Sequence, residues 1–208
     1  MTINELSNNI YVINLKERVD RKEHIVKELN KIKCNDYILF EGVNGNNIIN
    51  NTVLKNGMFG LVSTYLKIYD EWKLKKTNTI TIIEDDALFI DDFNEKLDEY
   101  VKNTPTNWDM MYFGCNHNKH MGIITTQNVN EYTLKLSHSY SAHCLILKDY
   151  VFEELISVIK NFTVENDVAL ANLQKKYNAY SSTITMVSQL PGYSNIENMN
   201  VDYNNIIC

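Results

Sequence analysis

The feature that most constrains the fold is the stretch TITIIEDDALFI at residues 79–90, where an apolar, β-branched run ends in three consecutive carboxylates. The run predicts a buried strand, central in a parallel or mixed sheet. Adjacent carboxylates repel one another, and burying any of them without a partner is costly. We therefore expect a fold that places Glu84, Asp85 and Asp86 at the end of a core strand to use them.

The spacing of these acids suggests a metal site. Alternate side chains of an extended chain share a face, so Glu84 and Asp86 should point together and Asp85 away. Two carboxylates that converge at a strand end form a hard-oxygen site for Mg²⁺ or Mn²⁺, completed by water and substrate phosphates. The alternative is an acidic turn before the next helix, since Asp91 and Asp92 come just beyond.

Two arginines follow the first expected strand, at residues 9–15. The helical spacing of apolar residues after it predicts a strand–turn–helix unit. Arg18 and Arg21 lie three residues apart near the start of that helix and share one face. Guanidinium groups beside a helix N-terminus, at the carboxyl edge of a sheet, suit an anionic ligand such as a diphosphate. The alternative is a solvated charged face that pairs with neighbouring acids.

The rest of the chain alternates strand and helix patterns. Further strands are expected at residues 37–40, 108–114, 131–136, 140–147 and 183–187, and helices at 60–75, 91–101, 149–160 and from Asn166, a plausible helix cap. This alternation predicts an α/β fold with a mostly parallel, twisted sheet in a single Rossmann-like domain over residues 1–208, in which 197–208 form a tail or ligand-covering segment.

Three polar features in these segments allow functional readings. Ser63, in the first turns of the helix expected at 60–75, can serve a ligand or act as a cap. Asp167 falls in the first turn of the helix that starts at Asn166, where the helix dipole alone favours an acid. Cys115, His117 and His120 follow the strand at 108–114, but their spacing fits no standard zinc site, so this segment is interpreted as a loop.

Charge and composition exclude several classes of protein. The 208 residues carry a formal net charge of −6 with a pI of about 5.4, which argues against a nucleic-acid partner. The four cysteines are scattered and predict no disulfide framework. No apolar run is long enough to cross a bilayer and the N-terminus lacks a signal pattern, so a cytoplasmic protein without a transmembrane segment is expected.

Taken in order, several motifs resemble those of glycosyltransferase family 25, which includes lipooligosaccharide and procollagen galactosyltransferases. The resemblance spans residues 10–196, and its motifs read YVINLKERVDRKEHI, GLVSTYLKIYDEW, TIIEDDALF, WDMMYFG, SAHCLIL, VENDVAL and SQLPGYSNI. It implies a GT-A fold, a UDP-sugar donor, a hydroxyl acceptor on a glycan or protein, and a divalent metal that is commonly Mn²⁺.

The resemblance also implies roles for individual residues. Glu84, Asp85 and Asp86 correspond to the DxD-type motif, with Glu84 and Asp86 as metal ligands. Asp167 matches an acidic motif late in the family and is the candidate base for an inverting transfer. Asn14, Arg18 and Arg21 match the N-terminal motif and are expected near the uracil, ribose or diphosphate. The other candidates for binding the donor are Leu15, Ser63, Asp85 and Gln189.

Two departures from the family pattern stand out. The family often has Ser-His where this chain has Ser63-Thr64, and usually Ser-Asp-Ile where this chain has Ser194-Asn195-Ile196. Two functions therefore remain open: a UDP-sugar transferase, or a nucleotide-sugar binding domain without productive transfer. A response-regulator pocket is rejected because its acidic pair follows the first strand, whereas these acids come after a long α/β segment.

Overall fold

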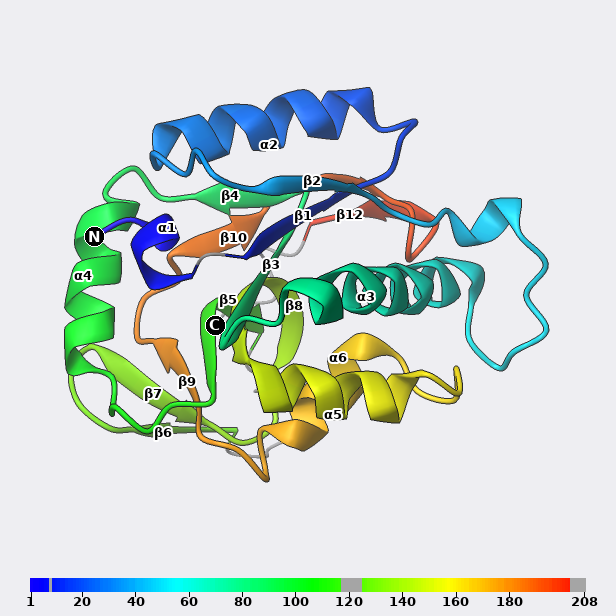
Figure 1. The fold of residues 1–208 in the computed structure, drawn as a ribbon. Coiled ribbons are helices and arrows are strands. Elements are labelled where there is room, and N and C mark those ends of the chain that lie inside the picture. The colour runs from blue at the N-terminus through cyan, green and yellow to red at the C-terminus, as the bar shows by residue number, and fades with distance from the viewer. Residues whose placement is uncertain (8, 117–124, 203–208) are drawn as a thin grey trace.

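The centre of the protein is an eight-stranded sheet in the order β2-β1-β3-β8-β5-β9-β7-β6 (Figure 1). The computed structural model describes residues 1–7, 9–116 and 125–202. The strands of this sheet are β1 (Ile10–Asn14), β2 (Ile38–Glu41), β3 (Thr79–Glu84), β5 (Met110–Asn116), β6 (Thr126–Asn128), β7 (Thr133–Leu136), β8 (Tyr140–Lys148) and β9 (Ala179–Ser182).

The α/β class predicted from the sequence is confirmed, but the sheet is mixed. Strands β2, β1 and β3 pair in parallel, as do β5 and β9. Strand β8 lies antiparallel between β3 and β5, and β7 is antiparallel to both β9 and β6. Strands β8 and β7 thus run opposite to the other six. Apolar alternation fixes which face a strand buries and not its direction, so the sequence pattern did not reveal this insertion.

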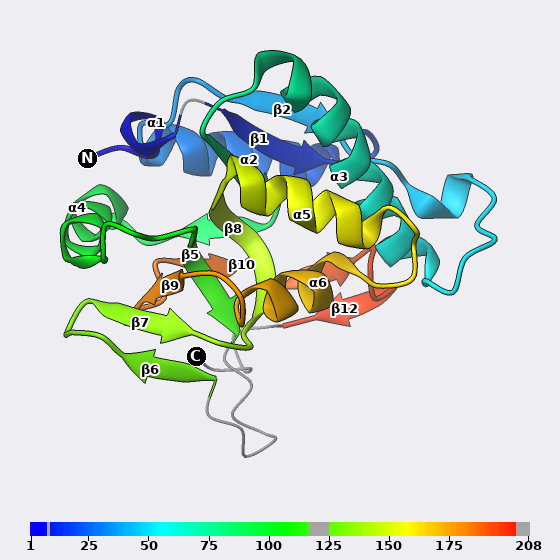
Figure 2. The same ribbon diagram turned by 60° about the horizontal axis from the view of Figure 1, so that its bottom comes forward.

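Helices cover both faces of the sheet (Figures 1 and 2). Tyr11 and Ile13 of β1 join the core beneath α3, α5 and α6, whereas Val12 joins the core beneath α2 and α4. This alternation is the period-two pattern of a strand buried on both sides. The helices are α1 (Ile3–Leu6), α2 (Val19–Lys31), α3 (Asn56–Lys75), α4 (Phe93–Asn103), α5 (Asp149–Ile159) and α6 (Asn166–Leu173), with a 3₁₀ turn η1 (Gly45–Asn47).

The strand predicted at residues 183–187 is wrong. Strand β9 ends at Ser182 and β10 (Val187–Gln189) begins only at the end of the predicted range. The β-branched residues between them form the connection from the main sheet to a separate two-stranded sheet of β10 and β4 (Ala87–Phe89). A β-rich composition cannot separate such a crossing segment from a strand.

A short hairpin of β11 (Gly192–Ser194) and β12 (Met199–Val201) completes the described chain. We call residues 192–201 the roof segment. Strand β12 falls within the range 197–208 that the sequence predicted to be a tail or ligand cover, and residues 203–208 lie outside the described residues. In the described part of the chain, none of the helices combines the length and apolarity needed to cross a membrane.

Candidate functional site

The main cleft opens where three parallel strands end. Residues Asn14 and Glu41 are register partners at the ends of β1 and β2, and Ile13 is the partner of Glu84 at the end of β3. In open α/β sheets, ligands bind outside the carboxyl ends of the strands, so this position is the expected one. The cleft measures about 730 Å³, and the roof segment contributes Ser194, Asn195 and Ile196 to its wall.

Only the first of the three acids belongs to the strand. Strand β3 ends at Glu84, and Asp85 and Asp86 form a turn before β4. The prediction that Asp85 points away from the other two acids is therefore wrong: all three line the main cleft. Alternation between faces applies only while the chain stays extended, and the sequence did not show where the strand stops.

Arg21 forms ion pairs with two of these acids. Its Nη1 atom lies 3.1 Å from Asp85 Oδ1 and 3.0 Å from Asp86 Oδ2, and the three side chains are only 12%, 10% and 8% exposed. The amide of Asn14 donates to the other oxygen of Asp85 at 2.7 Å. Burial is the main factor that raises the pKa of Asp85, and the bonds from Asn14 and Arg21 oppose it.

Arg18 joins the helix start to the roof segment. Its Nη1 atom donates to the carbonyl oxygen of Tyr193 at 3.0 Å and to Asn195 Oδ1 at 2.8 Å. Arg21 Nη2 also donates to Tyr193 at 3.0 Å, so both arginines reach the same carbonyl. Arg18 pairs with Asp20 as well, and that hydrogen bond is the main reason why the pKa of Asp20 falls to about 2. The ion pair with a neighbouring acid is thus observed for Arg18, and both arginines line the main cleft, where binding of an anionic ligand stays a prediction.

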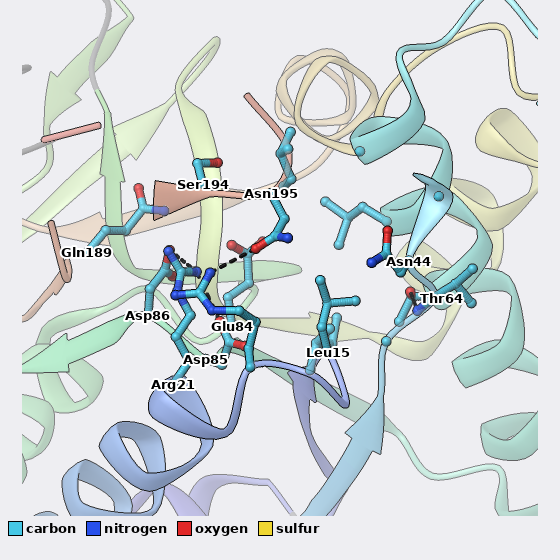
Figure 3. A pocket seen from close by; sticks show the side chains of 18 residues that line it. Leu15, Arg21, Asn44, Thr64, Glu84, Asp85, Asp86, Gln189, Ser194 and Asn195 are labelled. Atoms are coloured by element: carbon cyan, nitrogen blue, oxygen red, sulfur yellow. Dashed lines mark hydrogen bonds and ion pairs between the residues drawn. The ribbon is translucent and has the colours of Figure 1, made fainter. Parts of the chain in front are cut away.

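Figure 3 shows Glu84, Asp85, Asp86 and Arg21 gathered in one part of the main cleft, with Leu15, Asn44 and Thr64 in another. The glycines in the second part, Gly42 and Gly45, bring backbone close to the cavity. The cleft therefore has a strongly charged part and a less polar part with amide and hydroxyl groups. A diphosphate with its counter-ion suits the first, and a planar base suits the second.

Two carboxylates in the charged part, Glu84 and Asp86, are candidate ligands for a cation. Desolvation, followed by repulsion from Asp86, Asp167 and Asp85, raises the pKa of Glu84 well above its usual value. Asp86 Oδ1 is buried without a hydrogen-bond partner in the described residues. Carboxylate oxygens fit a hard divalent ion. No group of three or more His, Cys, Asp or Glu side chains in the described ranges is arranged to hold a metal, so water and substrate oxygens would complete the coordination.

The other predicted site residues are divided between three places. Leu15 and Gln189 line the main cleft. Ser63 Oγ instead bonds back to the carbonyl of Phe59 within α3, and its neighbour Thr64 reaches the cleft. Asp167 lies on a second cavity of about 750 Å³, which shares Glu84 and Gln189 with the main cleft. Of the predicted site residues, Leu15, Arg18, Arg21, Glu84, Asp85, Asp86 and Gln189 thus line the main cleft, whereas Asn14, Ser63 and Asp167 are not part of its lining.

Some predictions lie partly or wholly outside what the structure describes. His117 and His120 of the imagined zinc loop lie outside the described residues, and Cys115 is buried in the core.

The expected helix cap at Asn166 is wrong, because Glu165 is the N-cap and Asn166 is the first residue of α6. The one-residue shift places the Asn166 side chain inside the protein, at 2% exposure.

Sequence reasoning missed Asn44, Thr64 and Asn195 as cleft residues. Thr64 is adjacent to the predicted Ser63, so only the helical register was in error. The sequence showed Asn195 as a departure from a family motif, but no role was predicted for it. Asn44 lies in a turn-rich stretch, where its side chain accepts a bond from Asn46 N at 3.0 Å. No periodicity marks such a position.

Comparison with known sequences identifies relatives for part of the chain. The model of glycosyltransferase family 25 (LPS biosynthesis protein) matches residues 7–67, which include Asn14, Arg18 and Arg21. A procollagen lysyl hydroxylase and glycosyltransferase from Acanthamoeba polyphaga mimivirus is 30% identical over 164 residues. The resemblance to family 25 is confirmed. The match covers 66% of this chain but only 18% of the viral relative, so the chain spans less than a fifth of that protein.

Solved structures resemble this chain only distantly. A UDP-glucose pyrophosphorylase in complex with UDP-glucose covers 85% of this chain with 72% of its own, at 13% identity and a TM-score of 0.44. A glycosyltransferase involved in glycosylation of the major capsid of PBCV-1 covers 72% of this chain with 65% of its own, at 9% identity and a TM-score of 0.37. Structural similarity as low as this does not indicate which ligands the chain binds.

Proposed function

We propose that this chain transfers a hexose from a UDP-sugar to a hydroxyl group of a glycan or protein, assisted by Mn²⁺ or Mg²⁺ and with inversion at the sugar carbon. One observation carries the proposal. The carboxylates of Glu84 and Asp86 line the same cleft as the guanidinium groups of Arg18 and Arg21. A metal–diphosphate carries both signs of charge and matches this arrangement. Similarity to family 25, with its sugar-transfer chemistry, supports the reading.

The charged residues would have different roles in stabilising the leaving group. Arg18 and Arg21 lie at the start of α2, where they donate to the Tyr193 carbonyl of the roof segment. They could also donate to the phosphates, where positive charge stabilises the departing diphosphate. Asp85 is held by Asn14 and Arg21, so its role is to fix the arginine rather than to bind the ion. A cation bound by Glu84 and Asp86 would act as a Lewis acid on the leaving diphosphate.

Asp167 is the candidate acceptor base. It lines the second cavity together with Glu84, next to the charged part of the main cleft. As the acceptor oxygen bonds to the sugar carbon, the bond from that carbon to the UDP oxygen breaks and its electron pair leaves with UDP. Asp167 would take the acceptor proton in the same step.

Replacing Asp167 by Asn tests this role. The amide keeps the shape of the side chain but cannot take a proton, so we expect transfer to fall roughly 10²–10⁴-fold. UDP binding and the folded state should persist, because losing a first-turn charge costs only about 0.3–1 kcal/mol. Asp149→Asn is the matched control, since Asp149 lies in the first turn of α5 and lines neither cavity. Normal transfer by Asp167→Asn contradicts the base role.

A product assay separates an enzyme from a binding domain. UDP-glucose and UDP-galactose are incubated with Mn²⁺ and a panel of glycan and peptide hydroxyl acceptors, and UDP release and product mass are measured. Release of UDP with an acceptor product supports the proposal. Tight UDP binding without transfer or donor hydrolysis would instead favour the binding-domain alternative.

A further inference from the structure

Strand β8 is irregular near its first residues. Its pairing with β5 shifts register on both sides of the pair Gly114–Cys144. Ala142 joins the core beneath α3, α5 and α6, whereas Cys144 joins the core beneath α2 and α4, so the alternation of faces is broken at His143. Irregularities of this kind turn a side chain in a new direction and are frequent next to active sites.

The side chain of His143 joins β8 to β10. It is 3% exposed, and its Nε2 atom lies 2.9 Å from the carbonyl oxygen of Val187. A carbonyl oxygen only accepts, so Nε2 carries the ring proton and donates. Burial is the main factor that lowers the pKa of His143, and the bond to Val187 and the charge of Asp86 oppose it. In the part of the chain that the structure describes, Nδ1 has no hydrogen-bond partner, so this bond is the polar contact of the ring.

Gly114 makes this contact possible. A Cβ at this position would lie 1.8 Å from the carbonyl oxygen of Val187 and 2.3 Å from His143 Nε2. Since every other residue carries a Cβ, any of them would push β10 and His143 apart. A second bond joins the same strands, from the amide of Met186 to the carbonyl oxygen of Phe113 at 3.2 Å. The main sheet therefore holds β10 at closely packed points.

Strand β10 in turn fixes the backbone at Asp86. The amide of Leu190 donates to the carbonyl oxygen of Asp86 at 2.7 Å, directly beyond the paired residues of β4 and β10. Strand β4 is separately held by α2, where a carboxylate oxygen of Glu28 accepts from the amide of Phe89 at 2.9 Å. Because α2 holds β4 in place, a shift of β10 would separate it from Asp86. It would also move Gln189, which lines the main cleft.

We propose that His143 is a positioning residue for the reaction: by holding β10 against the main sheet, it sets the positions of Asp86 and Gln189 in the main cleft. This inference rests on the proposed function, because it takes Asp86 to bind the metal of a metal–UDP complex. His143 acts through β10 and touches neither the metal nor the nucleotide. The motif SAHCLIL contains this residue, but the sequence predicted no role for it.

Two substitutions separate the hydrogen bond from the volume of the ring. In His143→Gln an amide nitrogen can replace Nε2 as donor to Val187, whereas His143→Leu fills similar space without a donor. The measured quantity is the ratio of the UDP dissociation constants with EDTA and with Mn²⁺, determined by calorimetry on the full chain. This ratio should fall roughly fivefold or more in His143→Leu, because Asp86 is displaced, and should be retained in His143→Gln.

Hydrogen exchange gives a readout that needs neither metal nor nucleotide. The amides of Met186 and Leu190 are protected by their bonds to Phe113 and Asp86. Both should exchange roughly tenfold faster or more in His143→Leu, because they report local opening of β10, and should stay protected in His143→Gln.

Thr104→Val is the matched control. It removes another bond from a buried side chain to a backbone carbonyl, that of Tyr100, and Thr104 lines neither the main cleft nor the second cavity. Its UDP ratio and the exchange of the two amides should match those of the unaltered chain, whatever its stability.

The outcomes are distinct. If His143→Leu keeps the full effect of Mn²⁺ on UDP binding, His143 contributes only to stability and the inference is overturned. It is also overturned if His143→Gln behaves like His143→Leu, or if both variants lose UDP binding in EDTA, which would assign the residue to folding. An unaltered chain in which Mn²⁺ has no effect on UDP binding overturns the proposed metal site itself, and this inference with it.

Discussion

At the scale of single residues, Arg18 and Arg21 look alike in the sequence but differ in the structure. Arg21 is buried between Asp85 and Asp86, whereas the partner of Arg18 is Asp20, a side chain that is 67% exposed. Removing one member of a buried charge network leaves the others unpaired, which typically costs about 3–5 kcal/mol. Exposed ion pairs contribute roughly 0–1 kcal/mol.

Arg21→Ala should therefore destabilise the protein by about 3–5 kcal/mol. Arg18→Ala loses an ion pair to an exposed acid and its hydrogen bonds to the roof segment, and should cost less, about 1–3 kcal/mol. Chemical denaturation at pH 7 measures both. Arg18→Ala is consequently the cleaner probe of the ligand: it should weaken UDP binding by about 1.5–3 kcal/mol, the range of a lost charge-assisted hydrogen bond. Asp20→Asn is its control. An unchanged UDP affinity in Arg18→Ala would instead support the interpretation of this arginine as part of a solvated charged face.

Glu84 is expected to destabilise the metal-free protein. Its folded-state pKa is raised, chiefly by burial and then by the neighbouring acids, so the unfolded chain gives up this proton more readily than the folded one. Glu84→Gln should raise the free energy of unfolding at pH 7 by roughly 0.5–2 kcal/mol, as is common when functional strain is removed.

The pH dependence of this gain follows from the direction of the shift. Below the ordinary pKa of a glutamate the carboxyl is protonated in both states, so Glu84→Gln and the unaltered protein should be equally stable there. As pH rises toward the folded-state pKa, Glu84 increasingly lowers the free energy of unfolding of the unaltered protein, so the variant becomes the more stable of the two. Denaturation of both proteins from pH 4 upward measures the difference. A variant that is less stable at pH 7 contradicts the account.

At the scale of elements, local patterns predicted the β1–α2 unit well. The apolar run of β1 and the helical spacing of α2 are both decided by burial on the two faces of the sheet, and burial is what periodicity reports. The error at residues 183–187 and the mixed direction of the sheet have another origin. Both depend on which strands become neighbours in space, and a single strand's pattern does not contain that information.

The roof segment packs closely on the first turn of α3. A Cβ on Gly57 would lie 2.4 Å from Ile196 Cα and 2.7 Å from the carbonyl oxygen of Asn195. These contacts involve backbone, so an added methyl group must displace the roof segment. Because Arg18 bonds to Asn195, such a displacement also alters the main cleft.

Gly57→Ala should weaken UDP binding and destabilise the protein by about 1–3 kcal/mol, the usual cost of overpacking. Calorimetry and thermal unfolding measure the two effects. Lys67→Ala, an exposed change on the same helix, is the control and should alter neither. If Gly57→Ala binds UDP as the unaltered chain does, the position of the roof segment is not important for the ligand.

At the scale of the whole molecule, the sequence predicted which residues carry charge to the cleft but not how those charges pair. Glu84, Asp86, Arg18 and Arg21 line one cleft as expected, since each lies at or beyond the end of a strand at the same edge of the sheet. The salt bridges of Arg21 to Asp85 and Asp86 are products of three-dimensional packing. These contacts join segments far apart in the chain, so no local pattern records them.

The central claim is that one cleft binds UDP and a divalent cation together. Because two protein carboxylates leave most of the coordination to the ligand, metal and UDP should each tighten the other's binding, typically by about 1–3 kcal/mol. Asp86→Asn keeps the shape of the side chain but removes its charge, and should abolish the coupling while the protein stays folded.

The decisive measurement is the dissociation constant of UDP, determined by calorimetry with Mn²⁺ and again with EDTA. We expect Mn²⁺ to tighten UDP binding by roughly 5–150-fold in the unaltered chain, and to have no such effect in Asp86→Asn. The same UDP affinity with Mn²⁺ and with EDTA would contradict a shared metal–nucleotide site at Glu84 and Asp86.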